Sequence, residues 1–98
     1  MEERKPGTLN FSEALQCLKA GKKVCRSGWN GKGMYVVLQK GYPDGITANS
    51  NTREVLGLEE GAVVKVRPYL VMVDAQGMLV PWLASQTDIL ADDYAETL

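Results

Sequence analysis

The stretch that most constrains the fold of this chain runs from residue 28 to residue 33, where three glycines occur in six positions. Glycine enters turn conformations at little steric cost, so the stretch predicts a sharp reversal of the backbone. Its central dipeptide, Asn30-Gly31, is typical of a tight hairpin turn. Residues 24–25 before it and residues 34–39 after it are rich in β-forming side chains. The sequence therefore predicts two antiparallel strands joined at this point.

A helix is predicted near the N-terminus, before the hairpin. Asn10 and Glu13 have the spacing of a capping box, in which each side chain accepts a hydrogen bond from the backbone of the other. Four apolar residues then share one helical face: Phe11, Ala14, Leu15 and Leu18. Gly21 supplies a C-terminal stop. These signals predict a helix of about three turns, with its apolar stripe in the core.

The region from residue 40 to residue 58 is rich in turn residues. A short helical turn is predicted over residues 52–56, capped by Asn51 and stopped by Gly57. The region is long for a connection within a small domain, and such loops tend to be functional or mobile. Two interpretations stay open, namely a flap over a pocket and a solvated excursion.

The C-terminal half predicts further strands and a short helix. Residues 63–73 have the composition of a long strand, but Pro68 cannot donate to a ladder and marks an edge, a bend or a bulge. Residues 78–80 are predicted to pair back after a turn. Ser85 and Asp88 have capping-box spacing and predict a helix start. The predicted fold class is therefore α+β, with an N-terminal helix packed on a small antiparallel sheet and a short C-terminal helix.

Length and composition favour one soluble unit. Ninety-eight residues suit a single compact domain, predicted over residues 9–98 behind a flexible tail of residues 1–8. The polar start of the chain is unlike a signal peptide. The longest apolar runs are too short to span a bilayer. We expect no membrane association and a cytoplasmic location.

Composition also argues against several kinds of chemistry. The chain has no histidine, so Ser-His and Cys-His nucleophiles are impossible. Its two cysteines, Cys17 and Cys25, lack metal-ligand spacing and are interpreted as reduced thiols. We therefore expect a protein that is not an enzyme and that uses no metal and no cofactor.

Charge is distributed unevenly along the chain. Residues 1–40 carry eight Lys and Arg against three acids, net +5, whereas residues 41–98 carry three against nine, net −6. No dense basic run occurs, which argues against binding to nucleic acid. The opposite charges of the two halves fit ion pairing within the chain or between protomers equally well. A small anionic ligand near the basic half stays open.

The glycine-rich stretch carries side chains suited to a nucleotide. Trp29 offers a ring that can stack on a base, and Asn30 offers an amide for polar edges. Arg26 and Lys32 are candidate phosphate contacts, although each fits a solvated face equally well. A packing role for Trp29 is an equal alternative to a ligand role.

The second candidate binding element is the helix start at Ser85. Free backbone N–H groups at a helix start favour an anion, and Thr87 adds a hydroxyl. Asp88 would repel phosphate, so it suits ribose hydroxyls or an amino group. The plainer interpretation of Thr87 and Asp88 is helix initiation.

Three segments of this sequence together resemble a known family. They are Gly28-Trp29-Asn30-Gly31-Lys32-Gly33-Met34, Arg67-Pro68-Tyr69, and Val80-Pro81-Trp82-Leu83-Ala84-Ser85-Gln86-Thr87-Asp88 with its continuation to Tyr94. This combination is similar to the Thoeris anti-defense type 2 family of phages and prophages. The resemblance extends from Phe11 to Tyr94 and covers nearly the whole chain.

The resemblance implies a sponge, which is a protein that sequesters a nucleotide messenger of bacterial immunity without cleaving it. The family's characteristic ligand is glyco-cyclic ADP-ribose, which TIR-domain enzymes of the Thoeris system make in the host cytoplasm. Some relatives also hold cyclic di- or trinucleotides at a separate site. Family members form homotetramers with pockets between protomers. The pocket positions carried over by resemblance are Trp29, Asn30, Thr87 and Asp88.

Two other functions stay open on the residues alone. A hydrolase would use Asp88 and Asp92, but no recognisable motif places a second acid, and histidine is absent. A phage structural or protein-interaction module with no nucleotide ligand would use Trp29 as an interface anchor.

Overall fold

The computed structural model of the chain describes residues 7–29 and 33–97. In chain order the elements are α1 (Phe11–Lys19), β1 (Lys23–Arg26), β2 (Tyr35–Gln39), β3 (Tyr42–Thr47), α2 (Ser50–Leu56), β4 (Val63–Val66), β5 (Tyr69–Val73), β6 (Leu79–Pro81), α3 (Gln86–Leu90) and β7 (Tyr94–Thr97). Five strands form one antiparallel sheet in the order β6-β5-β2-β1-β7, which we call the main sheet. β3 and β4 form a separate two-stranded sheet. The predicted α+β class is confirmed.

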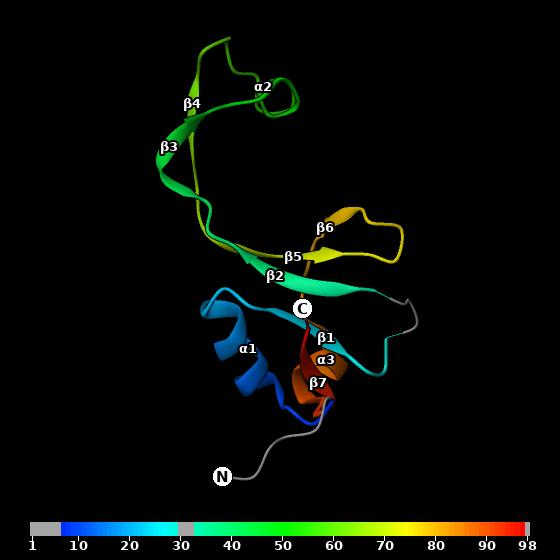
Figure 1. Ribbon diagram of the computed structural model, residues 1–98. Helices are drawn as coiled ribbons and strands as arrows, with labels where there is room; N and C mark the ends of the chain where they lie inside the picture. The colour runs from blue at the N-terminus through cyan, green and yellow to red at the C-terminus, as the bar shows by residue number, and fades with distance from the viewer. Residues whose placement is uncertain (1–6, 30–32, 98) are drawn as a thin grey trace.

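The core lies between α1 and the part of the main sheet that contains β1, β2 and β7 (Figure 1). Ala14 and Leu18 of α1 are each 1% exposed, and they pack with Val24 of β1 and Val36 of β2, which are fully buried. Val24 and Val36 are also register partners in the antiparallel pair of β1 with β2. The apolar stripe predicted for the first helix is therefore a packing stripe.

The N-terminal helix begins as predicted. The backbone N–H of Glu13 donates to Asn10 Oδ1 at 2.8 Å, and the backbone N–H of Asn10 donates to Glu13 Oε1 at 3.0 Å. The helix ends after Lys19, and Gly21 follows with a φ of 86°, which favours glycine. Its nine residues make about two and a half turns, slightly fewer than expected.

Two predicted strand pairings are present in the main sheet. β1 pairs with β2, which confirms the hairpin around the glycine-rich stretch, although residues 30–32 at its tip lie outside the described residues. β6 pairs back onto β5 after a turn in which the Gly77 N–H donates to the Asp74 carbonyl. The hydrophobic segments on either side of each turn therefore pair as expected.

The region of residues 40–58 differs from its prediction, because it contains a strand. β3 includes Pro43, Asp44 and Gly45, which are turn formers, and it nevertheless pairs with β4. The register shifts between Tyr42 and Ile46, so the turn formers occupy an irregularity in the strand. We call residues 42–66, which comprise β3, α2 and β4, the arm.

The helix of the arm starts earlier than predicted. Its cap is Asn49 and not Asn51, because Asn49 Oδ1 accepts a hydrogen bond from the Thr52 backbone N–H at 2.9 Å. The helix therefore begins at Ser50. Gly57 ends it in the left-handed conformation, as predicted.

The chain changes sheet at Pro68. β4 ends at Val66 in the arm and β5 begins at Tyr69 in the main sheet, so the predicted interruption is confirmed as a bend. Beside it, Gly41 has a φ of 70°, and a Cβ at this position would overlap the Val66 carbonyl. The two crossings between sheet and arm therefore lie close together. The arm projects from the main sheet (Figure 1), in a molecule of 54 × 28 × 25 Å.

The last strand, β7, is absent from the predicted elements. It pairs with β1 along its length, and its first residue, Tyr94, is 1% exposed. The centroid of the Tyr94 ring lies 5.9 Å from that of the Phe11 ring. The backbone of Tyr94 exchanges two hydrogen bonds of 2.9 Å with the backbone of Leu9. The two ends of the domain are thereby joined, whereas residues 1–6 of the predicted tail lie outside the described residues. Within the described ranges, none of the helices has the length and apolar content to cross a membrane.

Candidate functional site

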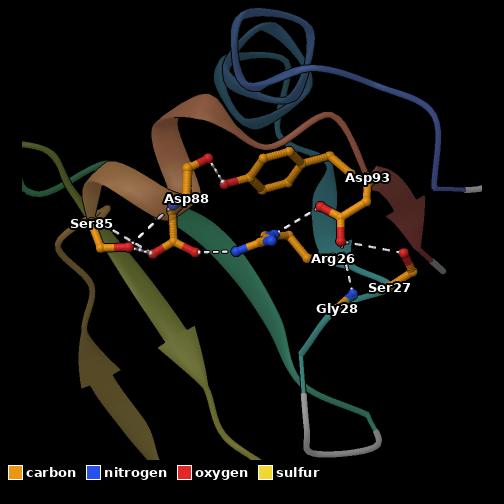
Figure 2. Close-up of polar contacts among 7 residues, drawn as sticks. Arg26, Ser27, Gly28, Ser85, Asp88 and Asp93 are labelled. Carbon is orange, nitrogen blue, oxygen red and sulfur yellow. Dashed lines mark hydrogen bonds and ion pairs between the residues drawn. The ribbon is translucent and has the colours of Figure 1, made fainter.

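Three segments from distant parts of the chain meet beside β1. β1 ends at Arg26 and leads into the glycine-rich stretch. α3 starts after Ser85, and Asp93 lies directly before β7. Figure 2 shows Arg26 between the carboxylates of Asp88 and Asp93, which lie 62 and 67 positions further along the chain. We call Arg26, Asp88 and Asp93 the charged cluster.

Arg26 forms its two ion pairs through different nitrogens. Nη1 lies 2.7 Å from Asp88 Oδ1, and Nε lies 2.8 Å from Asp93 Oδ1. The side chains of Arg26, Asp88 and Asp93 are 13%, 14% and 24% exposed. Short charge-assisted contacts at such low exposure stabilise more than ion pairs on the open surface. Since one cation faces two carboxylates, the cluster carries a net negative charge.

Hydrogen bonds keep all three members of the charged cluster ionised. The hydrogen bond from Arg26 holds the pKa of Asp93 below its usual range. Burial raises the pKa of Asp88, but hydrogen bonds from Ser85, Arg26 and the Trp29 side chain together lower it. The hydrogen bond to Asp93 raises the pKa of Arg26. The cluster is therefore fully charged at neutral pH.

Asp88 also closes the start of α3. Its backbone N–H donates to Ser85 Oγ at 3.1 Å, and its Oδ2 accepts from the Ser85 backbone N–H at 3.0 Å, which confirms the predicted capping box. The Asp88 carbonyl accepts a hydrogen bond from the Tyr94 hydroxyl at 2.7 Å. Burial raises the pKa of Tyr94 to about 12, so this hydroxyl stays a donor. Asp88 thus joins the helix start, the charged cluster and the core.

Trp29 lies where the glycine-rich stretch meets the core. Its half-buried ring is edge-on to Trp82 at 6.1 Å between centroids and edge-on to Tyr94 at 6.5 Å. Such edge contacts are a favourable aromatic geometry. Trp82 is itself half-buried and packs against the core. The packing role considered for Trp29 is therefore present.

The charged side chains of this site bind one another. Among residues 7–29 and 33–97, no three His, Cys, Asp or Glu side chains gather as metal ligands would. The Asp88 and Asp93 carboxylates instead accept hydrogen bonds from Arg26 and from backbone N–H groups. The arrangement is chemically suited to holding polar edges beside an aromatic ring.

Comparison with known proteins places this chain within a family. Residues 9–94 match the family described as the Thoeris anti-defense 2-like domain. The chain is also 34% identical over 87 residues to Thoeris anti-defense 2 of Bacillus phage SP01, an alignment that covers 88% of this chain and 91% of that protein. The chain belongs to the Thoeris anti-defense 2-like family. The resemblance seen in the sequence is thereby confirmed, and membership supports an anti-defense role.

The structure brings four of the predicted ligand positions together. Arg26, Trp29, Ser85 and Asp88 lie in or directly against the charged cluster. Arg26 is not on a solvated face, because its guanidinium lies between two carboxylates. Its predicted contact with phosphate stays a prediction.

The other three predicted positions are placed differently. Thr87 is exposed in the first turn of α3. Asn30 and Lys32 lie outside the described residues. Their roles as ligand contacts stay predictions.

Asp93 was not predicted from the sequence. It belongs to the site through its contacts with Arg26 and Gly28. A signal was present in the opposite charges of the two halves of the chain. The ion pairs of Arg26, and also the pair of Lys22 with Glu96, each join a basic residue of the first half to an acid of the second. That pattern indicates pairing within the chain, but it does not indicate which acid pairs with Arg26.

Proposed function

We propose that this chain is a phage anti-defense sponge that binds and sequesters glyco-cyclic ADP-ribose without cleaving it. The observation that carries the proposal is the meeting of two segments from opposite ends of the chain. Trp29 and Asp88 both contact Arg26 and Tyr94 within one protomer, and both belong to the region that matches the family. An aromatic ring beside fixed polar groups is a common way to hold a nucleotide.

The chemistry of the site suggests which residue binds which part of such a ligand. Stacking of a base on Trp29 is typically worth ~1–3 kcal/mol. The negative charged cluster suits ribose hydroxyls or an exocyclic amino group and repels phosphate, so Asp88 binds the sugar or the base edge. Thr87 and Ser85 at the start of α3, with Asn30 and Lys32 in the hairpin, complete the proposed contacts.

Sequestration without cleavage fits the chemistry of the charged cluster. A general acid or base needs a pKa near the working pH and a proton it can exchange. Asp88, one of the two acids of the hydrolase alternative, instead has a pKa lowered from its usual range and is bound to Arg26, as is the neighbouring Asp93. The chain also has no histidine. The hydrolase alternative is therefore the weaker one.

The proposal includes a homo-oligomer, most simply a tetramer, with each pocket completed by a second protomer. Sub-micromolar capture requires more than ~8 kcal/mol of binding free energy, which favours an enclosed and preorganised pocket. Two parts of the chain support assembly through their exposed apolar side chains. In the arm these are Val55, Leu56 and Val63, and in the segment from β6 to α3 they are Leu79, Leu83 and Leu90. Apolar side chains exposed in such groups mark contact surfaces.

The test is capture followed by release. The protein is mixed with glyco-cyclic ADP-ribose, native mass spectrometry records the assembly and the bound mass, and heating then releases the ligand for a second mass measurement. The expected result is stoichiometric binding to an oligomer and release of a ligand of unchanged mass. Sustained conversion to a new mass would show an enzyme.

The same experiment with cyclic di- and trinucleotides examines whether a second kind of ligand binds at a separate site, as the resemblance implies. Competition distinguishes the two arrangements, because a ligand at a separate site does not displace glyco-cyclic ADP-ribose. If the folded protein binds none of these molecules, the alternative of a phage structural or protein-interaction module is favoured. The proposed location, the cytoplasm of the host, is where a TIR product would be met.

A further inference from the structure

Asp93 contacts the segment that leads to Trp29 at several points. Its Oδ1 accepts from Arg26 Nε at 2.8 Å, and its Oδ2 accepts from the Gly28 backbone N–H at 2.8 Å and from the Ser27 hydroxyl at 3.3 Å. The Asp93 carbonyl accepts from the Ser27 backbone N–H at 3.1 Å. We propose that Asp93 is a positioning residue, which fixes the backbone from which the Trp29 indole projects and thereby sets the geometry of nucleotide binding.

The glycine at position 28 is explained by the same carboxylate. A Cβ on Gly28 would lie 2.9 Å from Asp93 Oδ2 and 3.4 Å from Arg26 Nη2, and the first distance is too short for an undisturbed contact. Gly28 is not among the glycines with positive φ, so its backbone conformation is open to alanine. Glycine is needed here because the carboxylate approaches the backbone closely. The Gly28→Ala substitution therefore displaces the Asp93 carboxylate while leaving every charge in place.

Trp29 follows Gly28 directly, so a shift of the backbone at Gly28 moves the indole. The backbone N–H of Trp29 donates to the Arg26 carbonyl at 3.3 Å, which is a long hydrogen bond. The ring itself contacts Trp82 and Tyr94 by its edges and is only half-buried. Neither contact fixes the start of the hairpin loop, whereas the hydrogen bonds that Asp93 accepts from Arg26, Ser27 and Gly28 do. Binding geometry held to a fraction of an ångström depends on such supporting contacts.

Loss of the Asp93 contacts weakens nucleotide binding only if Trp29 touches the nucleotide, so this expected effect rests on the proposed function. The expected change in the environment of the Trp29 indole is independent of the proposed function, because it can be measured in the protein without ligand. The chain has two tryptophans, so a Trp82→Phe background makes Trp29 the sole indole. Acrylamide quenching and the emission maximum then report on Trp29 alone.

The experiment compares Asp93→Asn, Gly28→Ala and the control Asp92→Asn, all in the full chain with circular dichroism to verify the fold. Asp92 is the exposed neighbour of Asp93, so its substitution removes the same charge from the same segment. We expect Asp93→Asn and Gly28→Ala to increase quenching of Trp29. We also expect them to weaken binding of glyco-cyclic ADP-ribose by about tenfold or more, which equals ~1.4 kcal/mol. Asp92→Asn should change neither quantity.

A double substitution adds a readout that loss of stability alone would not give. In an Asp93→Ala background the carboxylate is gone, so Gly28→Ala should produce little further change in quenching or affinity. Additive effects of the two substitutions would overturn the proposal, and so would unchanged quenching in Asp93→Asn and Gly28→Ala. If the wild type does not bind the nucleotide, the proposed function fails, and the quenching data still decide the role of Asp93.

Discussion

Replacing Asp88 with alanine should destabilise the protein, because this side chain both caps α3 and pairs with Arg26. Loss of a helix cap costs ~1 kcal/mol. The Arg26 Nη1 to Asp88 Oδ1 contact is 2.7 Å long between side chains that are 13% and 14% exposed. A hydrogen bond to a charged group in such a place contributes ~1.5–3 kcal/mol. We therefore expect a loss of about 2–4 kcal/mol in the free energy of unfolding.

The assay is thermal unfolding followed by circular dichroism at one fixed protein concentration, since the proposed assembly would make the midpoint concentration-dependent. For a domain of this size each kcal/mol lowers the midpoint by ~4–8 °C, so Asp88→Ala should lower it by roughly 10–30 °C. Ser85→Ala is the matched control, because it removes the cap hydroxyl and leaves the ion pair, and it should lower the midpoint by roughly 4–8 °C. Equal midpoints for the two variants would refute the reasoning, since the ion pair would then contribute nothing.

Three further outcomes are expected. Because the pKa values of Asp88 and Asp93 are lowered on folding, the folded protein binds fewer protons than the unfolded chain. The stabilisation by these carboxylates is complete above the unfolded pKa of about 4 and is lost as the pH falls through the folded pKa values. The urea midpoint should therefore drop steeply below about pH 4, and less steeply in Asp93→Asn. Leu18→Ala, at a side chain 1% exposed in the core, should lower the free energy of unfolding by ~2–5 kcal/mol in urea titrations. Val55→Ser on the arm, at a side chain 80% exposed, should weaken the oligomer in analytical ultracentrifugation without changing the circular dichroism spectrum, and an unchanged assembly would remove Val55 from any interface.

Local signals in the sequence predicted the elements that local contacts form. The capping boxes at Asn10 and Ser85 need only residues three positions apart, and both are present. The bend at Pro68 follows from one missing N–H donor. β3 could not be predicted in this way, because its pairing with β4 outweighs the turn preference of residues 43–45. β7 could not be predicted from local signals either, since it pairs with β1 and Tyr94 packs against Phe11, both near the other end of the chain.

The candidate site shows the same division between local and distant causes. The segments that contain Trp29 and Asp88 were identifiable from their motifs, and they do meet, through Arg26 and Tyr94. The arrangement of charge was not identifiable, because Arg26 has no local partner and its two carboxylates lie 62 and 67 positions away. Residue type alone suggested a phosphate contact or a solvated face for Arg26. Its position between two carboxylates is a property of the folded chain.

The most direct test of the central claim is a fluorescence titration with glyco-cyclic ADP-ribose of two single-tryptophan variants, with calorimetry to record binding. In Trp82→Phe, which retains Trp29, the expected result is a saturable change of emission as the base stacks on the indole. In Trp29→Phe, which retains Trp82, binding should be weaker and the change small. Binding recorded by calorimetry without any change in the emission of Trp29, or undiminished binding by Trp29→Phe, would contradict a nucleotide site built on Trp29 and the start of α3.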